Sequence, residues 1–232
     1  MLNSPLGGRY GIGGALGRSW KREAGGELSG WWNNNGAFSG CIAAYQPKGA
    51  ASYAASKVNL TGDATYNAVD PAGAVGWNTT DGWIGGSSKY ISTGYVISDI
   101  SHSVFIRFTD APSAATGIVG TYNAANASSL YIRPNSSFTT FYYYASNSFT
   151  TLLTTAGTLG LAGKDCYKNG SDIGDLSQTG TSAGPHPLFI FAINLNGSPG
   201  QYFTGKIQAF ALYSVTLTTS QAADLHTAMA AL

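Results

Sequence analysis

From Cys41 onward the sequence consists of short apolar segments separated by glycine, asparagine, aspartate and proline. Segments of this length suit β-strands, and their spacing is close to the roughly 8–12-residue interval of a β-sandwich. The pattern predicts an all-β fold of two packed antiparallel sheets. The expected strands are CIAAYQ, KYISTGYV, HSVFIRFT, GIVGTYN, SLYIRP, FTTFYYYA, DCYKNG, PLFIFAINL and GKIQAFALYS.

Two of these segments make sharper predictions. PLFIFAI (187–193) is apolar at nearly every position, which is typical of a single central strand buried on both faces. Asn169-Gly170 is the strongest hairpin signal in the chain, because both residues tolerate the positive φ angles of a type I′ turn. A two-residue turn there would pair Lys168 with Ser171.

The C-terminal end predicts a strand followed by a short helix. KIQAFALY (206–213) is apolar on both faces, and Thr218 with Gln221 forms the pattern of a capping box. Leu217 precedes the cap, where a hydrophobic staple would lie. A helix this short is not stable alone, so it is expected to dock on the domain. Its apolar stripe consists of Leu225, Met229 and Leu232.

Composition limits the class of protein. Glycine contributes 31 of 232 residues, about twice its usual share, and charged residues only 10%. A net charge of +1 does not favour a nucleic-acid partner. No stretch of about 20 apolar residues predicts membrane insertion. The first residues lack the pattern of a signal peptide, which favours a cytoplasmic product or one that leaves the cell in an assembled particle.

Residues 1–40 form a glycine-rich, basic segment without helical or strand periodicity. Such a segment buries too little apolar surface to fold alone. It is either a disordered tail or an extended arm that orders on another subunit, and the second alternative predicts a homo-oligomer or larger assembly. The residues expected to attach the arm are Arg9, Tyr10, Arg18, Trp20, Lys21, Arg22, Trp31 and Trp32.

A candidate binding surface comes from two neighbouring segments. If Leu130 and Ile132 face inward, alternation turns the intervening positions outward, and the same holds around Phe141. Pairing of the two strands would then gather an aromatic and basic patch suited to sugars or a protein partner. The alternative is that its tyrosines are half-buried sheet residues. The patch would consist of Tyr131, Arg133, Tyr142 and Tyr144.

The distribution of acidic residues argues against catalysis. Glycosidases use two carboxylates that flank the scissile bond. The only glutamates, Glu23 and Glu27, lie in the N-terminal segment, and no expected strand carries two acids at alternating positions. The three histidines stand in unrelated contexts. We therefore expect no enzyme activity and no cofactor.

Two further groups leave alternatives open. Asp172 and Asp175 flank the hairpin and are expected at the surface, with a calcium site as the second interpretation. Cys41 and Cys166 are either free buried thiols or one long-range disulfide. No Cys or His spacing predicts a transition-metal site.

The motifs together resemble a known family. DGWIGGSSKYISTGYV, HSVFIRF, DCYKNGSDIG and FTGKIQAFALYSVTLTTSQAADLH are similar to elements of the laminin-G-like group of concanavalin A-like jelly rolls. The resemblance covers residues 41–232 and leaves 1–40 outside. Its most specific part is the closing motif, matched by Gly205, Ile207, Phe210, Tyr213, Leu217, Thr218, Gln221 and Leu225.

The resemblance implies a two-sheet antiparallel jelly-roll sandwich, to which the residues themselves add an N-terminal arm and a short C-terminal helix. Family members bind glycans or proteins or serve as structural modules, and some relatives are glycoside hydrolases. The segment CIAAYQPKGAASYAASKVNLTGDATYNA (41–68) also looks like versions in phage structural proteins. The first hypothesis is therefore a virion structural protein, such as a capsid decoration or tail component. The second is a glycan-binding module of an extracellular or cell-surface adhesin, and the third a glycosidase with an unrecognised site.

Overall fold

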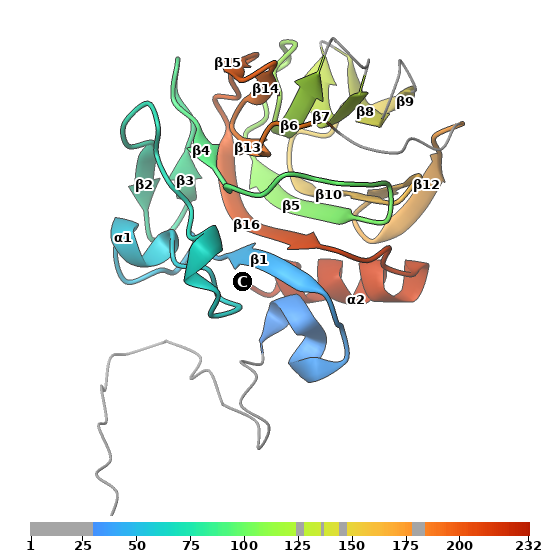
Figure 1. Cartoon of the computed structure of the whole chain (residues 1–232), viewed down its shortest axis with the longest axis horizontal. Helices are drawn as coiled ribbons and strands as arrows, with labels where there is room; N and C mark the ends of the chain where they lie inside the picture. The colour runs from blue at the N-terminus through green and yellow to red at the C-terminus, as the bar shows by residue number, and fades with distance from the viewer. Residues whose placement is uncertain (1–29, 124–127, 136, 144–147, 178–183) are drawn as a thin grey trace, which may run out of the picture.

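The computed structural model describes residues 30–123, 128–135, 137–143, 148–177 and 184–232. Within these ranges the chain forms two eight-stranded sheets packed face to face, with a C-terminal helix against the outer face of one of them (Figure 1). The predicted all-β sandwich is therefore confirmed. Arg9, Tyr10, Arg18, Trp20, Lys21 and Arg22 of the predicted arm lie outside the described residues.

The sheet that carries the helix is called the helix-covered sheet. Its strand order is β12-β11-β10-β5-β16-β3-β2, with β1 also paired to β16. Its strands are β12 (Ser171–Asp175), β11 (Asp165–Lys168), β10 (Gly157–Ala162), β5 (Ser103–Thr109), β16 (Lys206–Tyr213), β3 (Gly82–Ile84), β2 (Gly76–Asn78) and β1 (Cys41–Tyr45).

The other sheet is called the open sheet, because no described helix packs on its outer face (Figure 1). Its order is β15-β14-β6-β7-β8-β9, and β13 pairs with both β4 and β6. Its strands are β15 (Ser198–Gly200), β14 (Ile193–Leu195), β6 (Val119–Asn123), β7 (Ser128–Asn135), β8 (Phe138–Tyr143), β9 (Ser148–Leu152), β13 (Phe189–Ile190) and β4 (Ile91–Ser92).

The main core lies between the sheets. Leu130, Ile132 and Phe141 of the open sheet are fully buried, and they belong to one cluster with Ile106 and Phe210 of the helix-covered sheet. The inward positions expected of Leu130, Ile132 and Phe141 are thus confirmed, while the side chain of Tyr143, also expected inward, lies outside the described ones. Because these residues turn inward, their neighbours along each strand turn to the outer face.

A second cluster seals the outer face of the helix-covered sheet. The helix α2 (Thr219–Ala230) buries Leu225 and Met229 there, beside Tyr213 of β16. The short 3₁₀ helix η1 (Trp31–Gly36) packs against the same helix and buries both of its tryptophans. The two remaining short helices are α1 (Tyr53–Ser56) and η2 (Ala64–Tyr66).

This cluster corrects the predicted role of two arm residues. Trp31 is only 8% exposed and Trp32 only 2%, so neither is available to anchor the chain on another subunit. Their large apolar rings pack in the cluster on the outer face of the helix-covered sheet, together with residues of α2. The packed body therefore begins before Cys41.

The predicted helix cap at Thr218 and the predicted hairpin turn at Asn169-Gly170 are both confirmed. Thr218 caps α2 through a bond from the backbone N–H of Gln221, and the Gln221 side chain returns to the Thr218 backbone N–H. The Asn169-Gly170 turn has φ angles of 50° and 78° and pairs Lys168 with Ser171. Both elements depend on backbone requirements of a few consecutive residues.

The predicted central strand across PLFIFAI is wrong as a single strand. It divides into β13, which is antiparallel to β6, and β14, which is parallel to β6. Phe191 lies between them with a φ of 69°, which turns the chain. The Phe191 N–H bonds to the Ile118 carbonyl and its carbonyl accepts from Phe203, so tertiary bonds hold this conformation.

The two cysteines lie on opposite faces of the helix-covered sheet. Cys166 belongs to the core between the sheets, whereas Cys41 packs against the cluster under α2. Both are free thiols, and burial raises the pKa of each. A disulfide between them would have to pass through the sheet.

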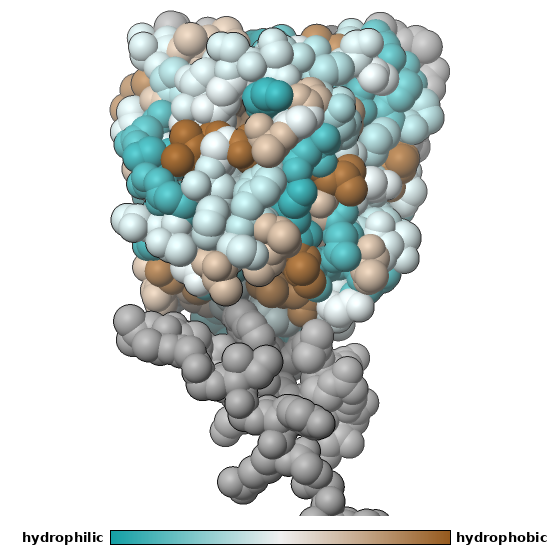
Figure 2. Space-filling view, turned by 90° about the vertical axis from the view of Figure 1, so that its left-hand side faces the viewer, coloured by the Kyte–Doolittle hydropathy of each residue, from teal (hydrophilic) through white to brown (hydrophobic). Residues whose placement is uncertain are grey.

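On the side drawn in Figure 2, apolar residues form small separate groups among hydrophilic ones. Among the helices of the described ranges, none has the length and apolar character needed to cross a membrane.

Candidate functional site

Strand register creates a row of four residues across the outer face of the open sheet. Gly120 of β6 pairs with Tyr131 of β7, which pairs with Tyr142 of β8, which pairs with Ser148 of β9. Cross-strand partners share a face of the sheet. The row therefore places two tyrosines side by side between a glycine and a serine.

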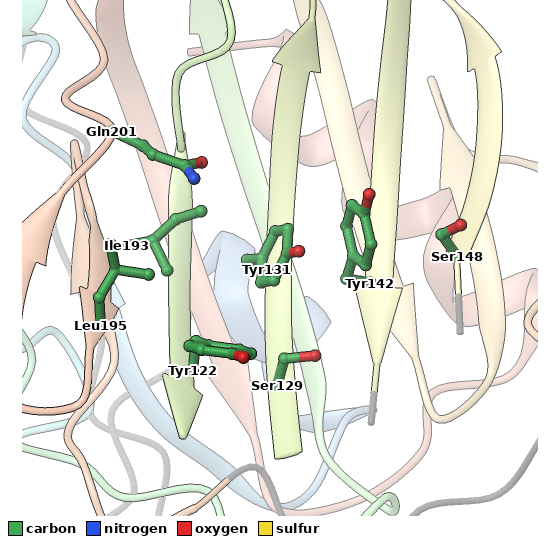
Figure 3. Close-up of a pocket in the computed structure, with 8 residues that line it drawn as sticks. All are labelled: Tyr122, Ser129, Tyr131, Tyr142, Ser148, Ile193, Leu195 and Gln201. Carbon is green, nitrogen blue, oxygen red and sulfur yellow. The ribbon is translucent and has the colours of Figure 1, made fainter. Parts of the chain in front are cut away.

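The two tyrosine rings stack on each other. Their centroids are 4.2 Å apart and their planes meet at 27°, and Figure 3 shows them on neighbouring strands. Burial raises the pKa of the Tyr131 hydroxyl, and the neighbouring Tyr142 raises it further, so the hydroxyl stays protonated at neutral pH. The pair is a preformed aromatic surface with hydroxyl groups that can donate and accept hydrogen bonds.

Small residues flank this pair on both sides. A Cβ atom at Gly120 would lie 2.2 Å from the Cβ of Tyr131, so only glycine fits at that position. On the other side Ser148 is exposed and short. The outward faces of the two rings therefore meet no large side chain from their immediate cross-strand neighbours.

Tyr131, Tyr142 and Ser148 line an open groove of about 470 Å³. Figure 3 shows that its side chains come from strands on both sides of β6, with Ile193 across β6 from Tyr131. Among the described residues of the lining, none carries a charged side chain. They are Tyr122, Ser129, Tyr131, Tyr142, Ser148, Ile193, Leu195 and Gln201.

Arg133 lies beside the groove, one outward position beyond Tyr131. Its guanidinium carbon is 5.8 Å from the centroid of the Tyr131 ring and 5.4 Å from that of Tyr142. Its guanidinium donates one hydrogen bond to the Oε1 of Gln201 and another to the Tyr142 hydroxyl, each with a donor–acceptor distance of 3.4 Å. The predicted patch is thus assembled as far as Tyr131, Arg133 and Tyr142 are concerned. Tyr144 lies outside the described residues.

Sequence reasoning missed Gln201 and Tyr122. Gln201 follows β15 and has a φ of 54°, a conformation that non-glycine residues seldom adopt. Such residues are concentrated at functional sites. No local pattern marks Gln201, because its approach to Arg133 depends on pairing between distant segments. Tyr122 could have been found from alternation in GTYN, since Val119 and Thr121 face away from it.

The carboxylates best suited to acid–base chemistry lie outside the groove, in the helix-covered sheet. Asp165 and Asp175 are cross-strand partners in β11 and β12. Burial, with two neighbouring carboxylates, raises the pKa of Asp165, whereas the Lys164 ammonium at 2.7 Å lowers the pKa of Asp175. No carboxylate is among the described residues that line the groove.

The residues of the predicted calcium alternative have partners of their own. Asp172 accepts a hydrogen bond from the backbone of Gly174, and Asp175 pairs with Lys164. Within the described ranges, no group of three or more His, Cys, Asp or Glu side chains is placed to hold a metal ion.

Two of the histidines take part in local hydrogen bonds. His102 is buried and bonds to the hydroxyl of Tyr95 at 2.8 Å. His226 on α2 contacts the Thr158 hydroxyl at 3.0 Å. Neither residue lies among those that line the groove.

Comparison with known proteins gives fold relatives. No family model and no curated protein sequence matches the chain. Domain 4 of AbnA, a GH43 extracellular arabinanase from Geobacillus stearothermophilus, was solved in complex with arabinotriose. It aligns over 81% of this chain and 98% of its own length, with 16% identity and a TM-score of 0.51.

Two further structures cover similar parts of the chain. Trypanosoma rangeli sialidase in complex with 2,3-difluorosialic acid aligns over 81% of this chain and 32% of its own, with 11% identity and a TM-score of 0.55. A botulinum neurotoxin type C structure, reported with cell entry that depends on two ganglioside molecules, aligns over 82% and 51%, with 16% identity and a TM-score of 0.52. At these identities the similarity establishes the jelly-roll sandwich and no more.

Proposed function

We propose that this protein is a glycan-binding module, and that its ligand lies in the groove beside Tyr131 and Tyr142. The observation that carries this proposal is the stacked tyrosine pair flanked by Gly120 and Ser148 on the sheet face that no described helix covers. Sugar rings stack on aromatic faces, while their hydroxyls bond to groups such as the Gln201 amide. A module of this kind acts outside the cell or at its surface.

Similarity in fold supports the proposal without deciding it. Structures with this fold include a domain solved with arabinotriose and a toxin that interacts with gangliosides. The virion role expected from the sequence depends on the likeness of residues 41–68 to phage structural proteins and on attachment through the N-terminal segment, whose first 29 residues lie outside the described ones. None of these comparisons supports it. A glycosidase is disfavoured at the groove because its lining offers no carboxylate.

A glycan array followed by calorimetry tests the proposal. Tyr142→Ala is expected to weaken binding of the best array ligand by about tenfold or more, because central aromatic contacts dominate such interfaces. The thermal midpoint should stay near that of the wild type, since Tyr142 is only half-buried.

Phe138→Ala is the matched control. Phe138 is an aromatic residue on the same strand, 47% exposed, and absent from the groove lining. Its substitution should leave affinity unchanged. The proposal is overturned if the array shows no ligand, or if Tyr142→Ala binds as well as Phe138→Ala.

A further inference from the structure

Within the part of the chain that the structure describes, Arg133 is the charged residue that bonds to the groove lining, and its hydrogen bonding is incomplete. Its two hydrogen bonds, to Gln201 and Tyr142, are both 3.4 Å long, well beyond the usual distance for a charged donor. Its buried Nε atom has no acceptor. A guanidinium offers five N–H donors, so most of its donor capacity is unused or weakly used.

The charge of Arg133 is also unbalanced. Three lysines of the described chain, Lys57, Lys164 and Lys206, each pair with an aspartate at 3.0 Å or less. No carboxylate of the described residues forms an ion pair with Arg133; its charged head contacts tyrosine rings instead. A half-buried cation without a carboxylate partner favours an anion supplied from outside.

The position of Arg133 connects this charge to the groove. Gln201, Tyr131 and Tyr142, which surround its guanidinium, all line the groove. The rings hold the guanidinium by cation–π contact, and the Gln201 amide oxygen accepts from the Nη1 group. An anionic group at the Arg133 end of the groove would meet the Nη groups of a planar guanidinium that these contacts position.

We propose that the groove binds an acidic saccharide, and that Arg133 recognises its carboxylate or sulfate group. This inference rests on the proposed glycan-binding function and adds the ligand class. The sugar ring would stack on the tyrosine pair while the anion accepts hydrogen bonds from the guanidinium. Arg133 then determines selectivity for charge, and the tyrosines provide affinity for the ring.

The test compares matched ligands on the full-length protein by calorimetry. Sialyllactose and sulfated lactose are each compared with lactose, and trigalacturonate is compared with its methyl ester. The wild type should bind at least one acidic form about tenfold or more tighter than its neutral partner, since hydrogen bonds between charged groups are stronger than those between neutral ones. The carboxylate and sulfate arms distinguish the two anions.

Variants separate charge from structure. Arg133→Gln should abolish the preference for the acidic form, measured as the ratio of acidic to neutral affinity within the same variant. Arg133→Lys should restore part of the preference, because it keeps the charge but loses the fork. Lys168→Gln on β11 is the control for net charge and should change nothing.

The outcomes distinguish the two proposals. If acidic and neutral forms bind equally, the acidic class is wrong although glycan binding stands. If Arg133→Gln keeps the preference for the acidic form, Arg133 is not the residue that recognises the anion. If no saccharide binds and Tyr142→Ala has no effect on any ligand, both proposals fail.

Discussion

The hydroxyl of Tyr213 donates a hydrogen bond to the backbone carbonyl of Trp32, although the two residues are 181 positions apart. The bond holds the segment before β1 against β16, the last strand along the chain. Both residues are buried in the cluster beneath α2. This cluster closes one face of the sandwich and leaves the opposite outer face, on the open sheet, as the one with the groove.

Removing this contact should destabilise the fold measurably. Trp32→Ala is expected to lower the free energy of unfolding by about 3–5 kcal/mol, because it leaves a cavity in a packed cluster. Tyr213→Phe should lower it by about 1–3 kcal/mol, because a buried carbonyl loses its donor. Urea denaturation measures both changes. Val58→Ala, at a side chain 49% exposed, is the control.

An equal, small effect in all three variants would contradict the packing of Trp32. The same contact sets a limit on truncation experiments. A deletion designed to test the N-terminal segment must end before Gly30, because removing residues 1–36 would also remove core tryptophans and confuse attachment with stability.

The type I′ turn requires glycine at its second position. Gly170 has a φ of 78°, and a Cβ there would lie 3.0 Å from both the Cα of Ala223 and the Cβ of His226. Gly170→Ala should cost about 1–2 kcal/mol of unfolding free energy from the left-handed conformation alone. Gly86→Ala is the matched control, because no atom lies within 4 Å of its added Cβ. Equal melting of the two variants would contradict the turn assignment.

Filling the space beside Tyr142 should block binding without unfolding the protein. Ser148 is exposed and lies directly across from Tyr142. Ser148→Phe is expected to stack on the tyrosine ring, keep or slightly raise stability, and reduce ligand affinity about tenfold or more. Ser148→Ala should bind like the wild type. Calorimetry with the best array ligand measures both, and unchanged binding by Ser148→Phe would place the ligand elsewhere.

His226 should contribute to a loss of stability in mild acid. Burial, and then the Arg107 charge, lower the pKa of His226 below its ordinary value of 6.5. Above pH 6.5 the ring is neutral in both states, so this contribution is fully present. As pH falls from there through the lower folded pKa, the unfolded chain binds the proton first and stability decreases.

The measurement for His226 is a difference between two proteins. His226→Gln should lose less unfolding free energy between pH 7 and pH 5 than the wild type, in urea titrations at both values. The comparison removes the contribution of carboxylates such as Asp99, whose pKa is lowered by hydrogen bonds from Ser101 and which affect both proteins alike. Identical pH dependence would show that His226 has no part in it.

Local features of this protein were predictable from its sequence. The Asn169-Gly170 turn and the Thr218–Gln221 cap depend on the conformational needs of a few consecutive residues. The inward and outward alternation of Leu130, Ile132 and their neighbours follows from the pleat of a single strand. The two-sheet sandwich follows from many such strands, since each must bury its apolar side.

The long-range relationships could be decided only by the tertiary structure. The sequence predicts Trp31 and Trp32 as exposed anchors. Their rings are buried instead, on the outer face of a sheet that is built mainly by later strands. PLFIFAI reads as one strand because nothing within it reveals the tertiary bonds that turn the chain at Phe191. Arg133 and Gln201, 68 residues apart, meet only because strand pairing brings their segments together. Sequence periodicity specifies which way a side chain faces, but which residue it meets depends on how distant strands align.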